Sequence, residues 1–240
     1  MKLEVNRNEL AGALSALGKL VSRTSAAEAY RCIEIEAADN QLYFRTRGTN
    51  EAIEFSMSVE TEETFRYVMN FDDFRNAVRG CKNRNVIFEW SGSVLLIDGE
   101  AETNADCDLP AIPAAPHDAH VEDLAAGFVN LLNTVAPLVN RTDYRKQLQG
   151  INLSTDGITV TNGKELLNIP LPIEVESMTI PFPLALMATR EQSDGVLRYW
   201  TNGTDVLFSV CIGNWLWTAK AVSGTYPNWK KIVPDRKVLP

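Results

Sequence analysis

The stretch Thr201-Asn202-Gly203-Thr204-Asp205-Val206-Leu207 places the dipeptide Asn-Gly between two runs of alternating apolar residues. Asn-Gly accepts the positive φ angles of a tight turn, so the stretch predicts the tip of a β-hairpin. The same arrangement of turn and strand occurs at residues 38–44, 90–96 and 154–160. An alternating run precedes each of the four tips, which indicates four β-rich segments built on antiparallel pairs.

A helix-like stretch precedes each β-rich segment. The first, from about Asn8 to Val21, repeats its leucines at intervals of three and four residues, as an amphipathic helix does. The other three are expected from Asp72, as the cap, to Lys82, from Val121 to Leu138, and from Pro183 to Thr189. The order of strand, helix and further strands therefore occurs four times, which predicts an α+β protein with internal duplication.

A proline-rich connector marks the middle of the chain, Leu109-Pro110-Ala111-Ile112-Pro113-Ala114-Ala115-Pro116-His117-Asp118. Its three prolines favour an extended segment over a helix. We therefore expect two domains, residues 1–116 and residues 119–234, followed by a short tail at residues 235–240. Each domain would hold two of the four repeats, and each is long enough to bury a core of its own.

Composition excludes several classes of protein. No apolar run reaches the roughly 18 residues that a membrane span requires, and the first residues carry charge where a secretory signal would be apolar. The four cysteines stand far apart in the sequence, which favours reduced thiols and predicts a cytoplasmic location. The net charge of −8 excludes a protein that coats nucleic acid over its whole surface, but it leaves room for a local basic face.

Three stretches carry a resemblance to a known family. Residues 220–234, KAVSGTYPNWKKIVP, are similar to the run K-x-V-x-G-x-[FY]-P-[DN]-[YW]-[RK]-[RK]-[VI]-x-P that ends the middle domain of the bacterial DNA sliding clamp, the beta subunit of DNA polymerase III. Residues 148–151 and 161–166 resemble the L-x-G and T-D-G-x-x-L motifs of the same domain. The first clamp domain is echoed by residues 1–5, by Arg23 and by the connector at residues 108–113, so the likeness spans nearly the whole chain.

This resemblance implies a DNA-clamp fold, with two helices packed on antiparallel sheets in each domain and with assembly into a ring. The family's third domain has no counterpart in these 240 residues, so we expect a shortened two-domain member. A ring of six domains then requires a homotrimer, and a tetramer with eight domains would also close. The implied function is a processivity factor that encircles duplex DNA without reading its sequence, with a clamp loader as a further partner.

In the clamp fold the helices line the hole, so basic residues on or beside them are expected to meet phosphates. The candidate DNA contacts are Lys19, Arg23, Arg75, Arg79, Lys82, Arg84, Arg141, Arg145, Lys146 and Arg190. For Arg75, Arg79 and Lys82, spacing alone would favour a solvated helix face, and the implied fold shifts that balance towards DNA contact. The third helix is expected to offer no positive charge, since Glu122 and Asp123 stand on its polar face, so the hole would be only patchily basic.

The resemblance also implies a groove that captures a short peptide of a DNA polymerase or another DNA enzyme. Carried over position by position, its lining is Leu148, Thr161, Gly163, Leu166, Pro227, Lys231 and Ile232. Ordinary core and edge positions are the alternative interpretation, because the family's groove also takes residues from the missing domain. The alternative function is a clamp-derived interaction protein, of a phage or mobile element, that binds replication proteins without encircling DNA.

Enzyme function finds no support in the sequence. The two histidines, His117 and His120, lie in or beside the connector, so neither a histidine-based triad nor a histidine metal cluster can be assembled. No Walker-type or GxGxxG loop is present, and the carboxylates stand mainly in alternating strands, as Glu34 and Glu36 do. We therefore expect a protein that is not an enzyme and that needs neither a cofactor nor a metal.

Overall fold

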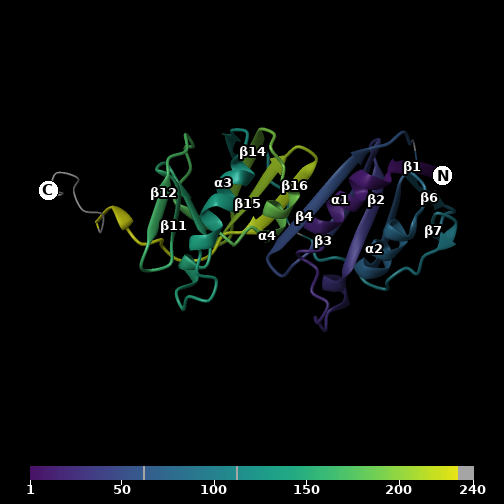
Figure 1. Cartoon of the computed structure of the whole chain (residues 1–240), viewed down its shortest axis with the longest axis horizontal. Helices are drawn as coiled ribbons and strands as arrows, with labels where there is room; N and C mark the ends of the chain where they lie inside the picture. Colours follow the sequence, from purple (N-terminus) through teal and green to yellow (C-terminus); the bar gives the residue numbers. More distant parts are fainter. Residues whose placement is uncertain (62, 112, 232–240) are drawn as a thin grey trace. The chain divides into compact units, whose positions relative to one another are not determined.

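The computed structural model describes residues 1–61, 63–111 and 113–231, and within them a repeat of one strand, one helix and three strands occurs four times (Figure 1). The first repeat comprises β1 (Lys2–Asn6), α1 (Arg7–Leu17), β2 (Cys32–Ala38), β3 (Gln41–Arg47) and β4 (Glu51–Ser58). The second comprises β5 (Phe65–Asn70), α2 (Phe71–Gly80), β6 (Asn85–Trp90), β7 (Leu95–Ile97) and β8 (Glu100–Ala101). The repeat order expected from the sequence is confirmed.

The second half repeats this order. The third repeat comprises β9 (His120–Leu124), α3 (Phe128–Val135), β10 (Ile151–Ser154), β11 (Gly157–Thr161) and β12 (Leu166–Ile169). The fourth comprises β13 (Met178–Ile180), α4 (Leu184–Thr189), β14 (Gly195–Asn202), β15 (Asp205–Ile212) and β16 (Trp215–Lys220). Short 3₁₀ helices lie in the connections, namely η1 (Glu28–Arg31), η2 (Ala136–Leu138), η3 (Lys146–Leu148) and η4 (Trp229–Lys231). The four expected hairpin tips are the β2–β3, β6–β7, β10–β11 and β14–β15 turns.

Neighbouring repeats exchange their first strands. β1 pairs with β6 in the sheet β1-β6-β7-β8, while β5 pairs with β2 and so extends the strands of the first repeat. In the same way β13 completes the sheet β12-β11-β10-β13, and β9 pairs with β14. Two successive repeats therefore depend on each other, because each sheet lacks a strand until the other repeat supplies it.

One antiparallel pair, β4 with β16, joins the two halves into an eight-stranded sheet of order β5-β2-β3-β4-β16-β15-β14-β9. Phe55 lies opposite Trp215 in this register, and their ring centroids are 4.7 Å apart. Trp217 is fully buried, and its indole Nε1 donates a hydrogen bond to Oε2 of Glu51 at 3.0 Å. Burial raises the pKa of the Glu51 carboxyl, so this indole bond is part of what allows the group to lie there.

By their internal contacts the described residues fall into two compact units. The first comprises residues 1–134 and 183–220, and the second comprises residues 135–182 and the described residues from 221 onward. The β4–β16 pairing explains why most of the fourth repeat belongs with the first half. The domain bounds expected from the sequence, 1–116 and 119–234, follow the repeats rather than these units and stay a prediction.

The core of the first unit is aromatic. Phe44 of β3 lies within 6.5 Å, centroid to centroid, of Phe55, Phe74 and Phe88, which come from β4, α2 and β6. Helix α1 packs against both α2 and α4 and buries its leucines completely or nearly so. No helix in the described part of the chain is long and apolar enough to cross a membrane.

The first two helices differ from their expected bounds at the caps. The side chain of Asn6 accepts hydrogen bonds from the backbone nitrogens of Asn8 and Glu9, so α1 begins at Arg7, and it ends at Leu17 rather than Val21. Asn70, not Asp72, caps α2, which begins at Phe71 and ends at Gly80. Asp72 stands in the first turn instead, where it is available to nearby arginines.

The third expected helix was wrong in its first third. Residues 121–124 belong to β9, whose pairing with β14 places Leu124 opposite Gly195, and α3 begins only at Phe128. Gly127 has a φ of 85°, which ends the extended segment and turns the chain into the helix. The apolar spacing from Leu124 to Phe128 fits a helix as well as a buried strand followed by a turn. At the fourth helix Pro183 is the cap position and α4 starts at Leu184.

Replacing Trp217 by Phe should destabilise the chain by about 1–3 kcal/mol more than the same replacement at Trp215. Both changes remove apolar volume, but of the two indoles only that of Trp217 donates a hydrogen bond to a half-buried carboxylate among the described residues. The difference in unfolding free energy should shrink as the pH falls. The pKa of Glu51 is raised in the folded chain, so this carboxylate takes up a proton first, and a neutral carboxyl needs the indole hydrogen bond less. Urea unfolding of both variants at several pH values measures this, and equal losses would contradict the role given to the Trp217–Glu51 bond.

Candidate nucleic-acid interface and partner groove

Two of the predicted DNA contacts are tied to one carboxylate. Asp72 accepts hydrogen bonds from Nε and Nη2 of Arg23 at 2.8 and 3.0 Å, and its Oδ1 lies 2.9 Å from Nη2 of Arg75. The Arg23 guanidinium holds the pKa of Asp72 below its usual range, so the carboxylate is ionised at neutral pH. The three groups together carry a net charge of about +1, and neither arginine meets a phosphate without competition from Asp72.

The remaining cations beside α1 and α2 are freer. Lys19, Arg79, Lys82 and Arg84 are exposed and have no ion pair within the part of the chain that the structure describes. The first of these follows α1, and the other three lie on or just after the last turn of α2. A phosphate approaching that end of α2 would meet three positive charges from six residues of chain.

Arg7 holds the C-terminal end of α2 in place. Its Nε and Nη2 donate to the carbonyl oxygens of Val78 and Arg79 at 3.4 and 3.3 Å, and its backbone nitrogen donates to the carbonyl of Arg84 at 3.0 Å. A guanidinium at the last carbonyls of a helix also compensates the negative end of the helix dipole. The sequence contains no signal for this contact, because Arg7 and Arg79 are far apart along the chain.

Three further predicted contacts lie in the second unit, before β10. The Arg141 guanidinium lies 4.7 Å from the centre of the Phe182 ring, and Lys146 is exposed. Arg145 forms a bidentate ion pair with Asp143, in which Nε and Nη2 donate to Oδ1 and Oδ2, both at 3.0 Å. This pair lowers the pKa of the largely buried Asp143 carboxyl, so the charge of Arg145 is compensated within its own loop.

The same loop presents Tyr144, which sequence reasoning missed. Its side chain is 87% exposed, although a large aromatic residue is normally covered in a folded protein. Arg145 lies 5.1 Å from its ring centre. An exposed aromatic ring beside cations is a surface on which a nucleobase or sugar can stack.

The last predicted contact, Arg190, is exposed at the end of α4, where its φ of 57° places it in the left-handed region. Helix α3 contains no basic residue, but the expectation that Glu122 and Asp123 stand on its polar face was wrong. Glu122 and Asp123 lie in strand β9, so they do not belong to the face of α3 at all. The polar side of α3 is formed by amides, with Asn130 and Gln192 exchanging hydrogen bonds.

The predicted partner groove is drawn from several segments of the second unit. Leu148 is buried in η3, Leu166 is half-buried in β12, and Pro227 and Lys231 are exposed. The hydroxyl of Thr161 donates to the carbonyl of Glu165 at 2.6 Å and accepts from the nitrogen of Gly163 at 3.0 Å, which fixes the β11–β12 turn. Gly163 has a φ of 87°, which explains the glycine there. Ile232 lies outside the described residues.

A cavity of 410 Å³ opens beside this set, between the β10–β11 turn and the segment before η4. Pro227 of the predicted groove lines it, together with Tyr226 and Trp229. Burial raises the pKa of Tyr226 to about 12, and its hydroxyl has no hydrogen-bond partner among the described residues. Nζ of Lys230 lies 2.7 Å from Oδ1 of Asp156, which stands in the β10–β11 turn. A cavity lined by polar side chains together with Pro227, Tyr226 and Trp229 is suited to a peptide segment.

Neither histidine belongs to a group of metal ligands among the described residues. No group of three or more histidine, cysteine or carboxylate side chains that could hold a metal is found among the described residues. His120 stacks on Tyr199 with ring centroids 4.8 Å apart, and His117 lies in the connector.

Comparison with known proteins gives one consistent result. Residues 1–119 match the family described as DNA polymerase III beta subunit, N-terminal domain. The beta sliding clamp of Helicobacter pylori strain J99 is 21% identical over 261 aligned residues, which include 98% of this chain and 67% of that protein. The corresponding protein of strain 26695 is 22% identical, with 99% and 68% covered. The chain thus spans about two thirds of the length of these curated relatives.

Solved structures agree on the fold. The H. pylori beta clamp bound to a DNA ligase peptide superposes with a TM-score of 0.78 at 20% identity, covering 98% of this chain and 70% of that one. The sliding clamp of Bartonella birtlesii bound to griselimycin gives 0.79 at 16% identity, covering 98% and 68%. These likenesses extend over the repeats of both halves. Residues 1–119 thus belong to the family of bacterial DNA sliding clamps, the beta subunits of DNA polymerase III, and the rest of the chain shares the clamp fold.

Proposed function

We propose that this chain works as a DNA sliding clamp, a processivity factor that encircles duplex DNA as a homo-oligomer and tethers a polymerase or another DNA enzyme. The observation that carries the proposal is the duplicated clamp fold together with unpaired cations at the end of α2. Family membership supports a non-catalytic role in replication, and we infer that the chain is not an enzyme and acts in the cytoplasm. A clamp loader would open the ring, since the chain has no nucleotide-binding loop.

Phosphate contact is assigned chiefly to Lys19, Arg79, Lys82 and Arg84, with Arg141, Lys146 and Arg190 as further contacts. We keep three further arginines in the interface, namely Arg23, Arg75 and Arg145. Their attraction for phosphate is weaker, because they form ion pairs with Asp72 and Asp143. Weak, sequence-blind contact is what sliding requires, because strong binding at one register would stop movement. Tyr144 adds a stacking surface beside Arg145.

Ring assembly follows from the equivalence of the repeats. The last strands of the first and fourth repeats, β4 and β16, pair with each other inside the chain. The last strands of the second and third repeats, β8 and β12, each have one neighbour in the described sheets. By the same pairing, β12 of one copy would meet β8 of the next, which is a head-to-tail contact that closes a ring if the rotation fits.

The β12 edge has the surface that such a contact needs. Leu167 and Ile169 lie opposite Val160 and Ile158 of β11, which are fully buried, yet they themselves are only half-buried. An apolar edge of this kind is normally covered by another element or another chain. Two domains per chain, 1–116 and 119–234, would give six in three copies, which favours a trimer over a tetramer.

Capture of a partner is assigned to the groove around Leu148, Thr161, Leu166 and Pro227, where a short peptide of a polymerase or ligase would bind. One relative has been solved with a DNA ligase peptide. The second candidate function, a clamp-derived protein that binds replication proteins without encircling DNA, is favoured by the ion pairs that engage three of the ten candidate cations.

Assembly tests the two functions directly. At 10 μM the chain should sediment with three times its own mass, and Leu167→Lys should shift it to monomer, because a charge on the β12 edge opposes strand pairing. Val94→Lys, at an exposed apolar residue of a hairpin tip, is the matched control and should stay a trimer. A wild-type monomer would contradict the ring and favour the second function.

DNA retention tests the cations. The double reversal Arg79→Glu with Lys82→Glu should shorten retention on closed circular DNA and lower the slope of log affinity against log salt by about 2, one for each lost phosphate contact. Arg31→Glu with Lys164→Glu has the same net charge and should behave as wild type. Loss of the clamp from linear but not from circular DNA would support encirclement. Equal retention on both would instead indicate simple surface binding.

A further inference from the structure

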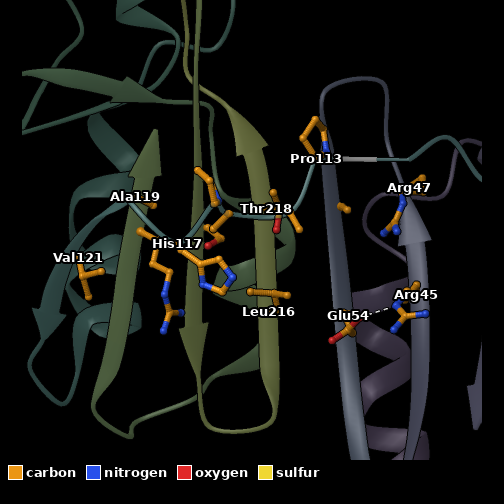
Figure 2. A pocket seen from close by; sticks show the side chains of 15 residues that line it. Arg45, Arg47, Glu54, Pro113, His117, Ala119, Val121, Leu216 and Thr218 are labelled. Carbon is orange, nitrogen blue, oxygen red and sulfur yellow. Dashed lines mark hydrogen bonds and ion pairs between the residues drawn. The ribbon is translucent and has the colours of Figure 1, made fainter. Parts of the chain in front are cut away.

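A cavity of 610 Å³ lies within the first unit, on the face of the eight-stranded sheet that does not carry α1 (Figure 2). Thr46 marks the other face, because its buried hydroxyl donates to the carbonyl of Leu17 in α1 at 2.8 Å. Successive residues of a strand point to opposite faces, so Arg45 and Arg47 of β3 point away from that helix. No role described above uses this cavity.

The strand register builds the cavity as a trough. Arg47 lies opposite Ala52, Ala52 opposite Thr218, Thr218 opposite Ser209, and Ser209 opposite Arg198. The floor between the two arginines therefore consists of three small side chains in a row across β4, β16 and β15. Figure 2 shows the connector passing over this floor, with Pro113 near β4 and His117 above β15 and β16.

Neither arginine at the ends of the trough forms an ion pair with a carboxylate among the described residues. Arg198 has no hydrogen bond or ion pair within the part of the chain that the structure describes. Nε of Arg47 donates to the neutral carbonyl of Pro110 at 3.1 Å, and burial lowers the pKa of this guanidinium. Glu54, the carboxylate that lines the trough, is already engaged by Arg45. A positive charge that is partly buried without a counter-ion favours the entry of an anion.

The size of the trough selects an extended ligand over a small ion. Four strand spacings separate Arg47 from Arg198, which places their Cα atoms about 19 Å apart. One phosphate or carboxylate cannot bridge side chains rooted at that distance. Carboxylates two residues apart on an extended peptide are about 7 Å apart at the backbone and reach further through their side chains. Leu216 and Val121 add apolar walls for a side chain between them.

We propose that this trough is a second partner site, which binds an extended acidic peptide segment of another protein with its carboxylates at Arg47 and Arg198. The peptide backbone lies over Ala52, Thr218 and Ser209, where small side chains permit close approach. The residue between the two acidic ones points away from the floor, because successive side chains of an extended peptide point to opposite faces. The site lies on the sheet face opposite α1, so it is separate from the DNA contacts assigned to α1 and α2, and it does not depend on DNA binding.

Isothermal titration of the full chain with N-acetyl-Glu-Leu-Glu-amide tests this proposal. The tripeptide should bind saturably, and N-acetyl-Gln-Leu-Gln-amide should bind about tenfold more weakly, because charge-assisted hydrogen bonds to arginine are lost. Arg198→Gln should lower the affinity for the acidic peptide by a similar factor. Arg31→Gln, at a half-buried arginine outside the trough, should leave it unchanged.

A second variant separates blocking from loss of charge. Thr218→Phe places a bulky side chain on the floor in a residue type that strands accept, so it should abolish binding while the unfolding midpoint stays close to wild type. Absence of saturable binding at millimolar peptide would overturn the proposal, as would equal affinities for wild type and Arg198→Gln. Displacement of the peptide by micromolar oligonucleotide or by inorganic phosphate would overturn the assignment to a protein partner.

A different observation carries a second proposal. The sulfur atoms of Cys32 in β2 and Cys107 before the connector lie 3.8 Å apart. Cys32 is 1% exposed and burial raises its pKa to about 12, whereas Cys107 is half-buried and so more accessible. Around them Val68 and Leu109 form a small apolar cluster, and the nitrogen of Ala105 donates to the carbonyl of Val68 at 2.8 Å. The segment before the connector is thus already held beside the edge strand β5.

We propose that Cys107 and Cys32 form a disulfide when the protein is oxidised by a peroxide. The Cys107 sulfur attacks one peroxide oxygen and becomes a sulfenic acid as water leaves; the Cys32 sulfur then attacks that sulfur and releases a second water. Two thiols are oxidised and one hydrogen peroxide is reduced to two waters. The bond would lock the start of the connector onto β2, which would fix the roof of the trough at one end.

Mass spectrometry of the intact chain after mild peroxide treatment tests this step. The mass should fall by about 2 Da, the thiol count should fall from four to two, and a peptide linking residues 32 and 107 should be found. Cys107→Ser should keep three thiols reduced, and Cys81→Ser should still form the bond. Oxidation beyond the sulfenic state at Cys107, or a linkage through Cys81 or Cys211, would overturn the proposal.

Discussion

The antiparallel pairing of β4 with β16 is the constraint on which the rest of the first unit depends. Without it the chain would have two sheets with open edges, and each edge would be free to pair with another molecule. With it, Trp215 and Trp217 are buried against Phe55 and Ile53, and one sheet carries residues from the first and the last repeat. The trough beneath the connector exists because this pairing puts Ala52 next to Thr218.

Much of the fold can be predicted from the sequence because local signals and long-range pairing agree. The turn dipeptides place four hairpins correctly, and the apolar stripes place α1, α2 and α4 within a few residues. Residues 121–124 were wrongly predicted as helix for a physical reason. A buried strand followed by a turn can place its apolar residues at the same intervals as an amphipathic helix does. The strand conformation of residues 121–124 depends on pairing with β14, about 75 residues later in the sequence. A local sequence pattern cannot predict such a distant partner.

The candidate site is less predictable for a related reason. The basic residues at the end of α2 can be chosen from their spacing, and the ion pair of Asp72 with Arg75 is a neighbouring pair on a helix that spacing could also have revealed. The bond from Arg23 to Asp72, the approach of Cys107 to Cys32 and the exposure of Tyr144 depend on contacts that only the folded chain makes. Such contacts change the charge or reactivity of a residue without changing its identity.

The net charge of −8 is distributed unevenly. Glu34, Glu36 and Glu54 surround Arg45 on the sheet face opposite α1, and Arg66 joins Glu34 to Asp108. Carboxylates that form ion pairs with arginines on that face do not oppose a phosphate that approaches α2 from the other face. An acidic chain can in this way keep one basic surface.

The exchange of first strands between neighbouring repeats has a consequence for how such chains can change in evolution. A single repeat cannot complete its own sheet, so the smallest piece that can be gained or lost without leaving a sheet one strand short is a pair of repeats. Relatives of this fold should therefore differ in length by whole pairs, and a breakpoint within a pair would expose one orphan strand on each side. The duplication visible in the sequence is then a record of the units in which the architecture can be divided.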